Sequence, residues 1–344
     1  MKKITAVLLS VMLFCCGCAT TESSVEPQSE MQSQVHIGIC FDTFTVERWS
    51  KDRDVFTYTA TNLGAKVDVQ NANGDINKQR EQITHLMDSG VDVLVIVAVD
   101  GEKLTDLLEK AHKKGIWIVA YDRMINNAPV DAYLSFDNEK VGKMMADAIV
   151  QKNGAGSRVL MIQGPQTDRN VSMVQAGFNE VARKNDMQVV GEFSVDGWRT
   201  EHVQEYFSEN AEILNNVDAI MCGNDSIAGE VIKILAEKRL AGQIIVVGQD
   251  ADVEACQHIV EGTQLMTVYK PVELLAQKAA ELSYHLATET NPLVDIKDTI
   301  NNGENEVPYV ILTPIAVSKE NMDEQIIDSG FHLEEDVYAN VVRP

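Results

Sequence analysis

Basic residues are scarce in this sequence. Its 344 residues include 29 Lys and Arg against 52 Asp and Glu, which gives a formal net charge of -23 at pH 7. A surface that acidic repels the phosphates of nucleic acids and the headgroups of anionic lipids. We therefore expect no nucleic-acid partner, while the charge by itself says nothing about catalysis.

Cysteine is also scarce, and half of the six cysteines lie within the first 18 residues. The other three, Cys40, Cys222 and Cys256, are far apart and do not have the spacing of metal ligands. An odd number of cysteines cannot pair completely within one chain. The sequence therefore predicts no metal site, and it predicts that these three side chains serve as small buried apolar groups.

Motifs that bind cofactors or carry out catalysis are missing. The chain has neither a GxGxxG nor a GxxxxGK(S/T) run, so no nucleotide cofactor is expected and no other cofactor is implied. Its seven histidines form no HExxH motif and no Ser-His-Asp order. We therefore expect a binding protein and not an enzyme.

The apolar run near the N-terminus is short. It covers Ile4–Phe14 and follows the two basic residues Lys2 and Lys3. A run of this length cannot cross a bilayer and is typical of the central region of an export signal. The sequence therefore predicts a signal peptide over residues 1–18 and an exported product.

The end of this leader resembles the lipobox of bacterial lipoproteins, in which a cysteine after a small residue is lipidated. Residues 15–19 read Cys-Cys-Gly-Cys-Ala. We predict lipidation at Cys18, which follows Gly17, with Cys16 or simple cleavage as the alternatives. Residues 19–34 are polar and predict a flexible tether. The product is expected at the outer face of the cytoplasmic membrane or in the periplasm.

Length and periodicity predict two α/β lobes. A chain of this length with 45% hydrophobic residues is too long for one core. Short apolar strands alternate with helical segments from Val35 onward, and the pattern restarts near Val141. This alternation predicts two doubly wound parallel sheets. The expected lobes are residues 35–140 plus 272–303 and residues 141–270 plus 312–344.

Polar side chains follow almost every predicted strand. Ligands gather at the carboxyl ends of the strands in doubly wound sheets, so these side chains are candidates for a binding site. Capping of the next helix is the alternative role. It suits Asp225 and Asp252, but it does not suit Arg48, Arg123 or Lys270.

Several of these segments resemble one family. They are Glu47-Arg48-Trp49, Ala120-Tyr121-Asp122-Arg123, Asp196-Gly197-Trp198, Gly248-Gln249-Asp250-Ala251-Asp252 and Thr267-Val268-Tyr269-Lys270-Pro271. The chain resembles the periplasmic sugar-binding proteins of ABC importers, and among them the D-xylose-binding members, from about Val35 to Phe331. The resemblance implies a monomeric receptor of the type I fold, with its two lobes joined by three hinge crossings. Such a receptor closes around a sugar and delivers it to an importer permease.

The resemblance also implies which residues hold the sugar. They are Arg48, Asp122, Arg123, Asp168, Asn170, Trp198, Asn224, Asp250 and Lys270. The sequence departs from the family pattern at Arg169, where the family has a smaller residue. An arginine there is expected to alter the rim of the cleft and so to affect which sugar is bound.

The charges of the candidate site independently predict a neutral ligand. The site holds three cations and three carboxylates: Arg48, Arg123, Lys270, Asp122, Asp168 and Asp250. An ionic ligand requires a site with a net opposite charge, because unpaired buried charge is costly. A neutral polyol needs both hydrogen-bond donors and acceptors. Trp198, and Trp49 unless it belongs to the core, offer flat faces for the C–H groups of a sugar.

Three other functions are considered. Asp122 and Asp168 resemble the paired carboxylates of a glycosidase, but nearby cations lower carboxyl pKa values and so disfavour a general acid. A receptor of the same design can instead signal to a membrane histidine kinase or a chemoreceptor. A sugar-responsive repressor would need an N-terminal helix-turn-helix, where this chain has a signal peptide.

Overall fold

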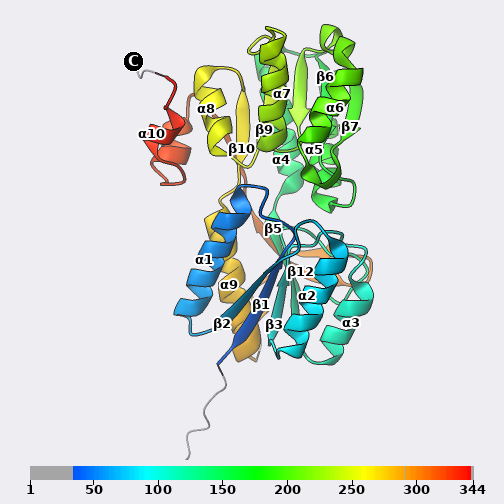
Figure 1. The fold of residues 1–344 in the computed structure, drawn as a ribbon, viewed down its shortest axis with the longest axis vertical. Helices are drawn as coiled ribbons and strands as arrows, with labels where there is room; N and C mark the ends of the chain where they lie inside the picture. Colours follow the sequence, from blue (N-terminus) through cyan, green and yellow to red (C-terminus); the bar gives the residue numbers. More distant parts are fainter. Residues whose placement is uncertain (1–33, 291, 342–344) are drawn as a thin grey trace, which may run out of the picture. The chain divides into compact units, whose positions relative to one another are not determined.

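The computed structural model describes residues 34–290 and 292–341, which fold around two β-sheets (Figure 1). The first sheet has the strand order β11-β12-β5-β4-β3-β1-β2. Its strands are β1 (His36–Phe41), β2 (Lys66–Asn71), β3 (Val93–Ile96), β4 (Trp117–Tyr121), β5 (Ala132–Phe136), β11 (Thr299–Asn301) and β12 (Glu306–Leu312). Its helices are α1 (Arg48–Asn62), α2 (Ile76–Asp88), α3 (Thr105–Lys113) and α9 (Val272–Thr288).

The second sheet has the strand order β13-β10-β9-β8-β6-β7. Its strands are β6 (Arg158–Gln163), β7 (Gln188–Ser194), β8 (Ala219–Cys222), β9 (Ile245–Gln249), β10 (Met266–Tyr269) and β13 (Ile315–Ser318). The α-helices of this lobe are α4 (Asn138–Asn153), α5 (Arg169–Lys184), α6 (Glu201–Glu209), α7 (Asp225–Glu237), α8 (Val253–Glu261) and α10 (Glu334–Val337). Two 3₁₀ turns, Asp196–Trp198 and Ala211–Asn216, and a π-helical turn, Asp323–Ile327, complete it.

Burial on both faces explains the apolar strands. In β3, Leu94 and Ile96 pack into a core with α2 and α3, whereas Val93 and Val95 pack into the opposite core with α1 and α9. Alternate side chains of a strand point to opposite faces, so a parallel strand covered on both sides must be apolar throughout. The predicted fold of two doubly wound lobes is confirmed. Two edge strands, β11 and β13, run antiparallel to their neighbours.

The chain crosses between the lobes three times. The crossings lie between β5 and α4, between β10 and α9, and between β12 and β13. Two boundaries differ from those expected from the sequence. The helix of the second lobe already begins at Asn138, capped by Asp137, and the first lobe continues through Leu312, because β12 pairs with β5.

The helices α4 and α5 pack unusually closely in the second lobe. A Cβ at Gly142 would lie 1.9 Å from the carbonyl oxygen of Val174, and a Cβ at Gly177 would lie 1.9 Å from that of Glu139. Only glycine permits such an approach of two helix backbones. The contact fixes the N-terminal end of α5, which carries two of the predicted site residues.

The three cysteines of the described residues, Cys40, Cys222 and Cys256, are buried and unpaired, as expected. Burial raises the pKa of the Cys40 thiol to about 12, so this group stays protonated and unreactive. The predicted signal peptide, the lipidation site Cys18 and residues 19–33 of the tether lie outside the described residues.

No helix within the described part of the chain is both long enough and apolar enough to span a membrane.

Candidate binding site

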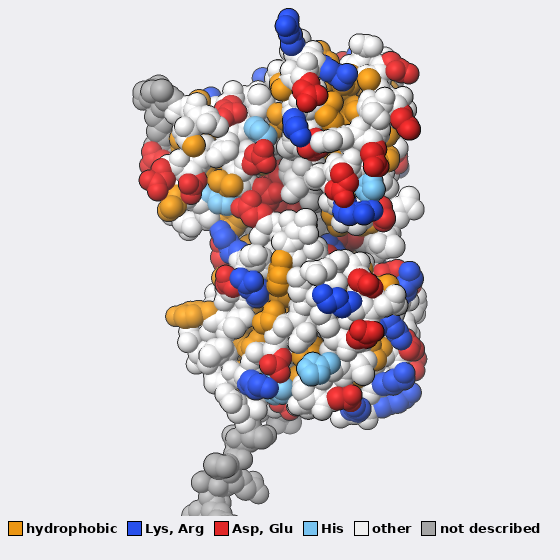
Figure 2. Space-filling model, viewed as in Figure 1, with side chains coloured by type: hydrophobic (Ala, Val, Ile, Leu, Met, Phe, Trp, Pro, Cys, Tyr) orange, Lys and Arg blue, Asp and Glu red, His pale blue; other side chains and the backbone are white. Residues whose placement is uncertain are grey.

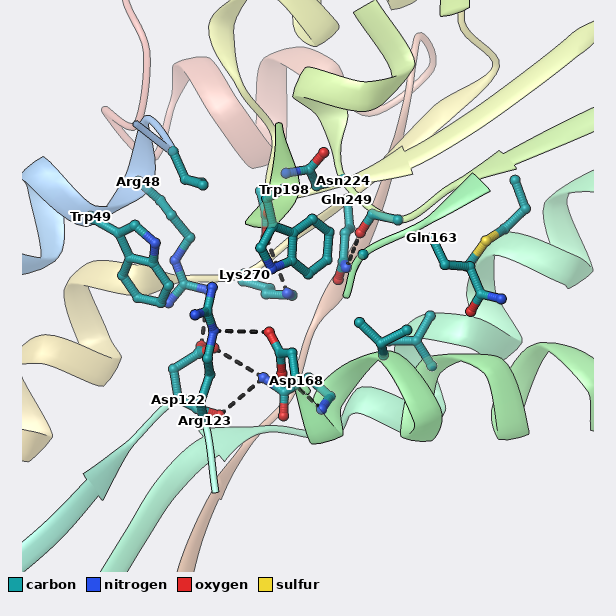
Figure 3. Close-up of a pocket in the computed structure, with 18 residues that line it drawn as sticks. Arg48, Trp49, Asp122, Arg123, Gln163, Asp168, Trp198, Asn224, Gln249 and Lys270 are labelled. Carbon is teal, nitrogen blue, oxygen red and sulfur yellow. Dashed lines mark hydrogen bonds and ion pairs between the residues drawn. The ribbon is translucent and has the colours of Figure 1, made fainter. Parts of the chain in front are cut away.

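One pocket brings together all ten side chains predicted from the sequence (Figure 3). It holds about 510 Å³ of empty space, part of it open to solvent. The predicted residues that line it are Arg48, Trp49, Asp122, Arg123, Asp168, Asn170, Trp198, Asn224, Asp250 and Lys270. All except Trp198 are less than a tenth exposed. Both lobes therefore contribute to one enclosed, polar site.

The ends of the parallel strands position most of these groups. Asp122 and Arg123 follow β4 directly, Asp250 follows β9 and Lys270 follows β10. Asp168 lies between β6 and α5 and caps that helix, accepting a hydrogen bond of 3.0 Å from the Asn170 N–H. The capping role and the role in the site are therefore combined in one residue.

Strained backbone conformations cluster at this site. Positive φ angles occur at Asp122 (61°), Trp198 (60°), Asp250 (98°) and Ala251 (57°). Each such conformation costs a non-glycine residue roughly 1–3 kcal/mol, and such residues concentrate at ligand sites. The first three carry side chains that line the pocket, so the strain serves to aim them.

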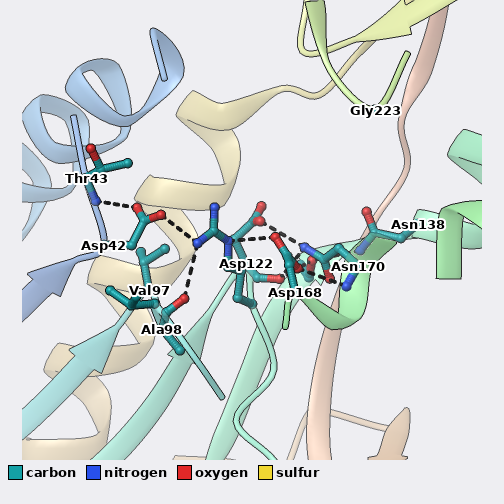
Figure 4. A network of polar contacts seen from close by, with 12 residues as sticks. Asp42, Thr43, Val97, Ala98, Asp122, Asn138, Asp168, Asn170 and Gly223 are labelled. Carbon is teal, nitrogen blue, oxygen red and sulfur yellow. Dashed lines mark hydrogen bonds and ion pairs between the residues drawn. The ribbon is translucent and has the colours of Figure 1, made fainter. Parts of the chain in front are cut away.

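Arg123 connects the two lobes through two carboxylates, Asp42 and Asp168, which are labelled in Figure 4. Its Nη1 lies 2.6 Å from Asp42 and donates to the Ala98 carbonyl at 3.2 Å, while its Nε lies 2.8 Å from Asp168 of the second lobe. Burial acts to lower the pKa of Arg123, but Asp42 and Asp168 outweigh it and hold that pKa above its ordinary value. The guanidinium is therefore permanently charged and fixed in orientation.

Two carboxylates hold Arg48 in a similar way. Its Nη1 lies 2.9 Å from Asp122 and its Nη2 lies 3.2 Å from Asp52, one helical turn along α1. The buried hydroxyl of Tyr121 also donates to Asp52. Burial raises the pKa of Asp52 to about 6, although Arg48 opposes the shift. Asp122 differs, because Arg48, Lys270 and Arg123 outweigh its burial and lower its pKa.

The structure adds two carboxylates that the sequence-based charge sum omitted. Asp42 pairs with Arg123, and Asp52 pairs with Arg48. Neither carboxylate lines the pocket. The buried cluster thus holds five carboxylates and three cations. The groups that line the pocket are still three carboxylates and three cations. A neutral polar ligand remains the best match to the surface that a ligand would touch.

Sequence reasoning missed two lining glutamines. Gln163 ends β6 and Gln249 ends β9, so their position at strand ends was the available signal. The side-chain amide of Gln249 donates to the Gly223 carbonyl. The Oε1 atoms of both glutamines, and the indole N–H groups of Trp49 and Trp198, are buried without a hydrogen-bond partner among the described residues. Buried polar atoms normally have partners, so these four point to a polar ligand.

The two tryptophans differ in role. Trp198 lies against the backbone of Gly164, where a Cβ would come within 2.2 Å of its ring, so this close approach requires glycine. Trp49 is 2% exposed, packs in the core and also lines the pocket, with the Arg48 guanidinium 4.3 Å from the centre of its ring. Trp49 therefore both fills the core and supports Arg48 by a cation–π contact.

The helix caps around Asp250 differ from those expected. Asn224, and not Asp225, caps α7 by accepting a hydrogen bond of 2.9 Å from the Ile227 N–H. The Asp225 carboxyl turns inward and accepts from Thr267 at 2.6 Å. Asp252 stands at the start of α8 but makes no side-chain cap. These buried carboxyls instead brace the loop that carries Asp250.

Arg169 does not line the pocket, contrary to what its position between Asp168 and Asn170 suggests. Its guanidinium reaches across the rim to the first lobe, where it donates to Asn126 Oδ1 at 3.0 Å and to the Asn301 carbonyl at 3.1 Å.

Acidic side chains gather where the two lobes meet on the face shown in Figure 2. A surface hollow is lined by Glu47 of the first lobe and by Asp225, Asp252 and Glu254 of the second. Burial raises the pKa of Asp252 to about 8, and Asp250 and Glu47 add to the shift. Burial also raises the pKa of Asp225, with Asp252 as the next contribution.

Asp252→Asn is expected to flatten the pH dependence of stability. The raised pKa means that the folded protein binds a proton that the unfolded chain has already lost above about pH 4. The free energy of unfolding therefore falls as the pH rises towards 8, by at most about 1.4 kcal/mol per pH unit for one proton. Urea unfolding from pH 5 to 8 checks this. Asp147→Asn, on the exposed face of α4, is the control, and an equal slope in Asp252→Asn would contradict the assignment.

Known proteins share both the sequence and the fold. Residues 37–291 match the periplasmic binding protein domain family. The D-xylose-binding periplasmic protein of Escherichia coli is 43% identical over 310 residues, covering 88% of this chain and 93% of the relative. The D-xylose-binding periplasmic protein of Haemophilus influenzae is 41% identical, covering 98% and 99%.

A solved structure shows the same fold. The solute-binding protein of an ABC transporter from Clostridium phytofermentans, with bound β-D-glucose, superposes with a TM-score of 0.79 at 28% identity, covering 88% of this chain and 99% of that one. These relatives are sugar- or solute-binding proteins. The chain therefore belongs to the periplasmic binding protein family and has the two-lobed type I fold of its sugar-binding members.

Proposed function

We propose that this protein is an extracytoplasmic receptor that binds D-xylose between its lobes and delivers it to an ABC importer. The observation that carries the proposal is the lining of the pocket, where charged groups of both signs stand beside four buried polar atoms without partners among the described residues. The identity of 41–43% to two D-xylose-binding proteins supports the choice of sugar.

The chemistry of the lining suits a small polyol. Each sugar hydroxyl donates one hydrogen bond and accepts others, and the lining offers donors in Arg48 and Lys270 and acceptors in Asp250 and Gln249. Hydrogen bonds to charged groups contribute about 1.5–3 kcal/mol each. They also discriminate, because a sugar that lacks one hydroxyl leaves a buried charged group unpaired.

The two lobes divide the groups that would hold the sugar. Arg48, Asp122 and Arg123 belong to the first lobe, whereas Asp168 and Asp250 belong to the second. A ligand that contacts both sets of residues favours the closed arrangement of the lobes. The shift in free energy equals that of the contacts that exist only in the closed arrangement. Closure of this kind gives a membrane partner a shape that reports the bound sugar.

Calorimetric titration with D-xylose, D-ribose, D-glucose and L-arabinose tests the proposal. We expect one site per chain, with D-xylose bound most tightly and recovered unchanged after incubation. Binding of none of these sugars would overturn the proposal, and conversion of the sugar to a product would overturn its non-enzymatic part.

The lipid anchor is a separate part of the proposal, supported by the sequence around Cys18. Cys18→Ala is expected to release the protein from membranes and to abolish its labelling by a fatty-acid analogue, because acyl chains supply the anchoring free energy. Cell fractionation with metabolic labelling measures both effects. Cys16→Ala is the matched control, and membrane retention of Cys18→Ala together with release of Cys16→Ala would move the site to Cys16.

A further inference from the structure

The N-terminal end of α5 contacts the first lobe through three consecutive residues. Asp168 lies 2.8 Å from Arg123, and the Asn170 amide donates to Asp122 at 3.1 Å. The residues that make these two contacts all line the pocket. Arg169, between them, points outward instead and bridges the rim, so its contact with the first lobe does not depend on touching the ligand.

The acceptors of Arg169 are already fixed within the first lobe. Asn126 donates its amide to Glu102 at 2.5 Å and its backbone N–H to Gly101 at 3.1 Å. The side chain of Asn301 donates to Glu306 at 2.7 Å. An acceptor that is held in place loses little entropy when a partner arrives.

We propose that Arg169 is a closure latch: a positioning residue that stabilises the closed form and slows release of the sugar without touching it. Arg169 and its acceptors lie on different lobes, so the two hydrogen bonds exist only when the lobes are together. A contact present only in the closed state shifts the equilibrium towards that state by its full free energy. The inference rests on the proposed sugar-binding function.

The latch also explains how the receptor tunes its affinity. Asp168 and Asn170 line the pocket, whereas Arg169 does not, so Arg169 can set the lifetime of the closed form without changing the surface that meets the sugar. Arginine suits this role because one guanidinium nitrogen reaches both acceptors, at 3.0 and 3.1 Å. Lysine has the charge and the N–H donors, but its nitrogen is one atom nearer the backbone along the side chain, so it should restore only part of the effect.

Stopped-flow binding of D-xylose tests the latch. Arg169→Ala should raise the dissociation rate about 5- to 20-fold and leave the association rate within about twofold, because the latch forms after the sugar enters. Arg169→Lys should lie between this variant and the parent. Arg183→Ala, on the exposed last turn of the same helix, is the matched control and should change neither rate.

A merely structural role for Arg169 predicts a different pattern. It would lower the melting temperature of the sugar-free protein, whereas the latch lowers only the increase in melting temperature that the sugar produces. A double-mutant cycle with Asn126→Ala adds a second check: once Arg169 is alanine, removing Asn126 should change the dissociation rate less than twofold.

Two results would overturn the latch. One is a dissociation rate for Arg169→Ala within twofold of the parent. The other is equal radii of gyration for parent and Arg169→Ala by small-angle X-ray scattering at partial saturation with sugar, where the latch predicts a larger value for the variant. If the parent binds no sugar at all, the proposed function fails instead. The latch forms on the bound sugar and falls with it in that case, whereas a parent that binds the sugar and a variant that releases it at the parent's rate overturn the latch alone.

Discussion

Asp250→Ala is expected to weaken D-xylose binding by about 30- to 1,000-fold, which corresponds to about 2–4 kcal/mol. The Asp250 carboxylate lies 3.1 Å from Lys270, and both side chains are less than a tenth exposed. The oxygen in this ion pair, Oδ1, is buried and makes no further hydrogen bond within the described residues. Removing the carboxylate takes away an acceptor for the sugar and leaves the ammonium of Lys270 buried without its partner.

Isothermal titration calorimetry measures this loss. Asp250→Asn keeps the shape and one acceptor but not the charge, so its loss should lie between those of the parent and Asp250→Ala. Glu109 is an exposed residue of α3 whose ion pair within the described residues is with Lys113. Glu109→Ala is therefore the control and should bind as the parent does. Parent-like affinity in Asp250→Ala would show that the sugar does not sit against this loop.

Arg123→Met is expected to lower the free energy of unfolding by about 3 kcal/mol at pH 7, in addition to abolishing measurable sugar binding. The variant leaves the carboxyl of Asp42 buried without the cation that neutralises it, and in the closed form it does the same to Asp168. Breaking a buried ion pair costs about 3–5 kcal/mol, and the low end applies because the open cleft admits water. Urea unfolding of the sugar-free protein measures the effect.

The destabilisation in Arg123→Met should shrink as the pH falls. Burial already raises the pKa of Asp42 and of Asp168, with Arg123 opposing both shifts. Without Arg123 both pKa values rise further, so the folded variant takes up protons more readily than the unfolded chain. Its stability therefore improves relative to the parent towards pH 5 and worsens towards pH 8. A penalty that does not change with pH would contradict the ion-pair account.

Arg80→Met is the matched control for this variant. Arg80 also pairs with a carboxylate, Asp106, at 2.7 Å, but that carboxylate is 60% exposed. Water screens such a pair, so the change should cost less than about 1 kcal/mol. The comparison separates the loss of a buried ion pair from the loss of an arginine side chain as such.

Much of the site could be predicted because strand ends converge. Arg123, Asp250 and Lys270 are far apart in the sequence, yet each follows a buried apolar strand, and the strands of a doubly wound sheet end at one edge. The apolar run around β3 and the repeated alternation of strand and helix were sufficient for the fold. The resemblance to the sugar-binding family, together with these strand ends, therefore led to ten of the eighteen residues that line the pocket.

The remaining details depend on contacts that no local pattern encodes. Asp52 is one helical turn from Arg48, but only packing against Tyr121 buries it and makes it the partner of that arginine. The inward turn of Asp225 depends on Thr267, 42 residues further along the chain. The bridge from Arg169 to Asn301 likewise depends on how the lobes close, because the two residues lie on different lobes.

A crystal structure of the protein with D-xylose tests the central claim most directly. The account predicts one sugar between the lobes, with hydroxyls bonded to Arg48 and Asp122 of the first lobe and to Asp250 of the second, and with a ring face against Trp198. It also predicts partners for the side-chain oxygens of Gln163 and Gln249. A sugar bound elsewhere, or one that contacts a single lobe, would contradict the account.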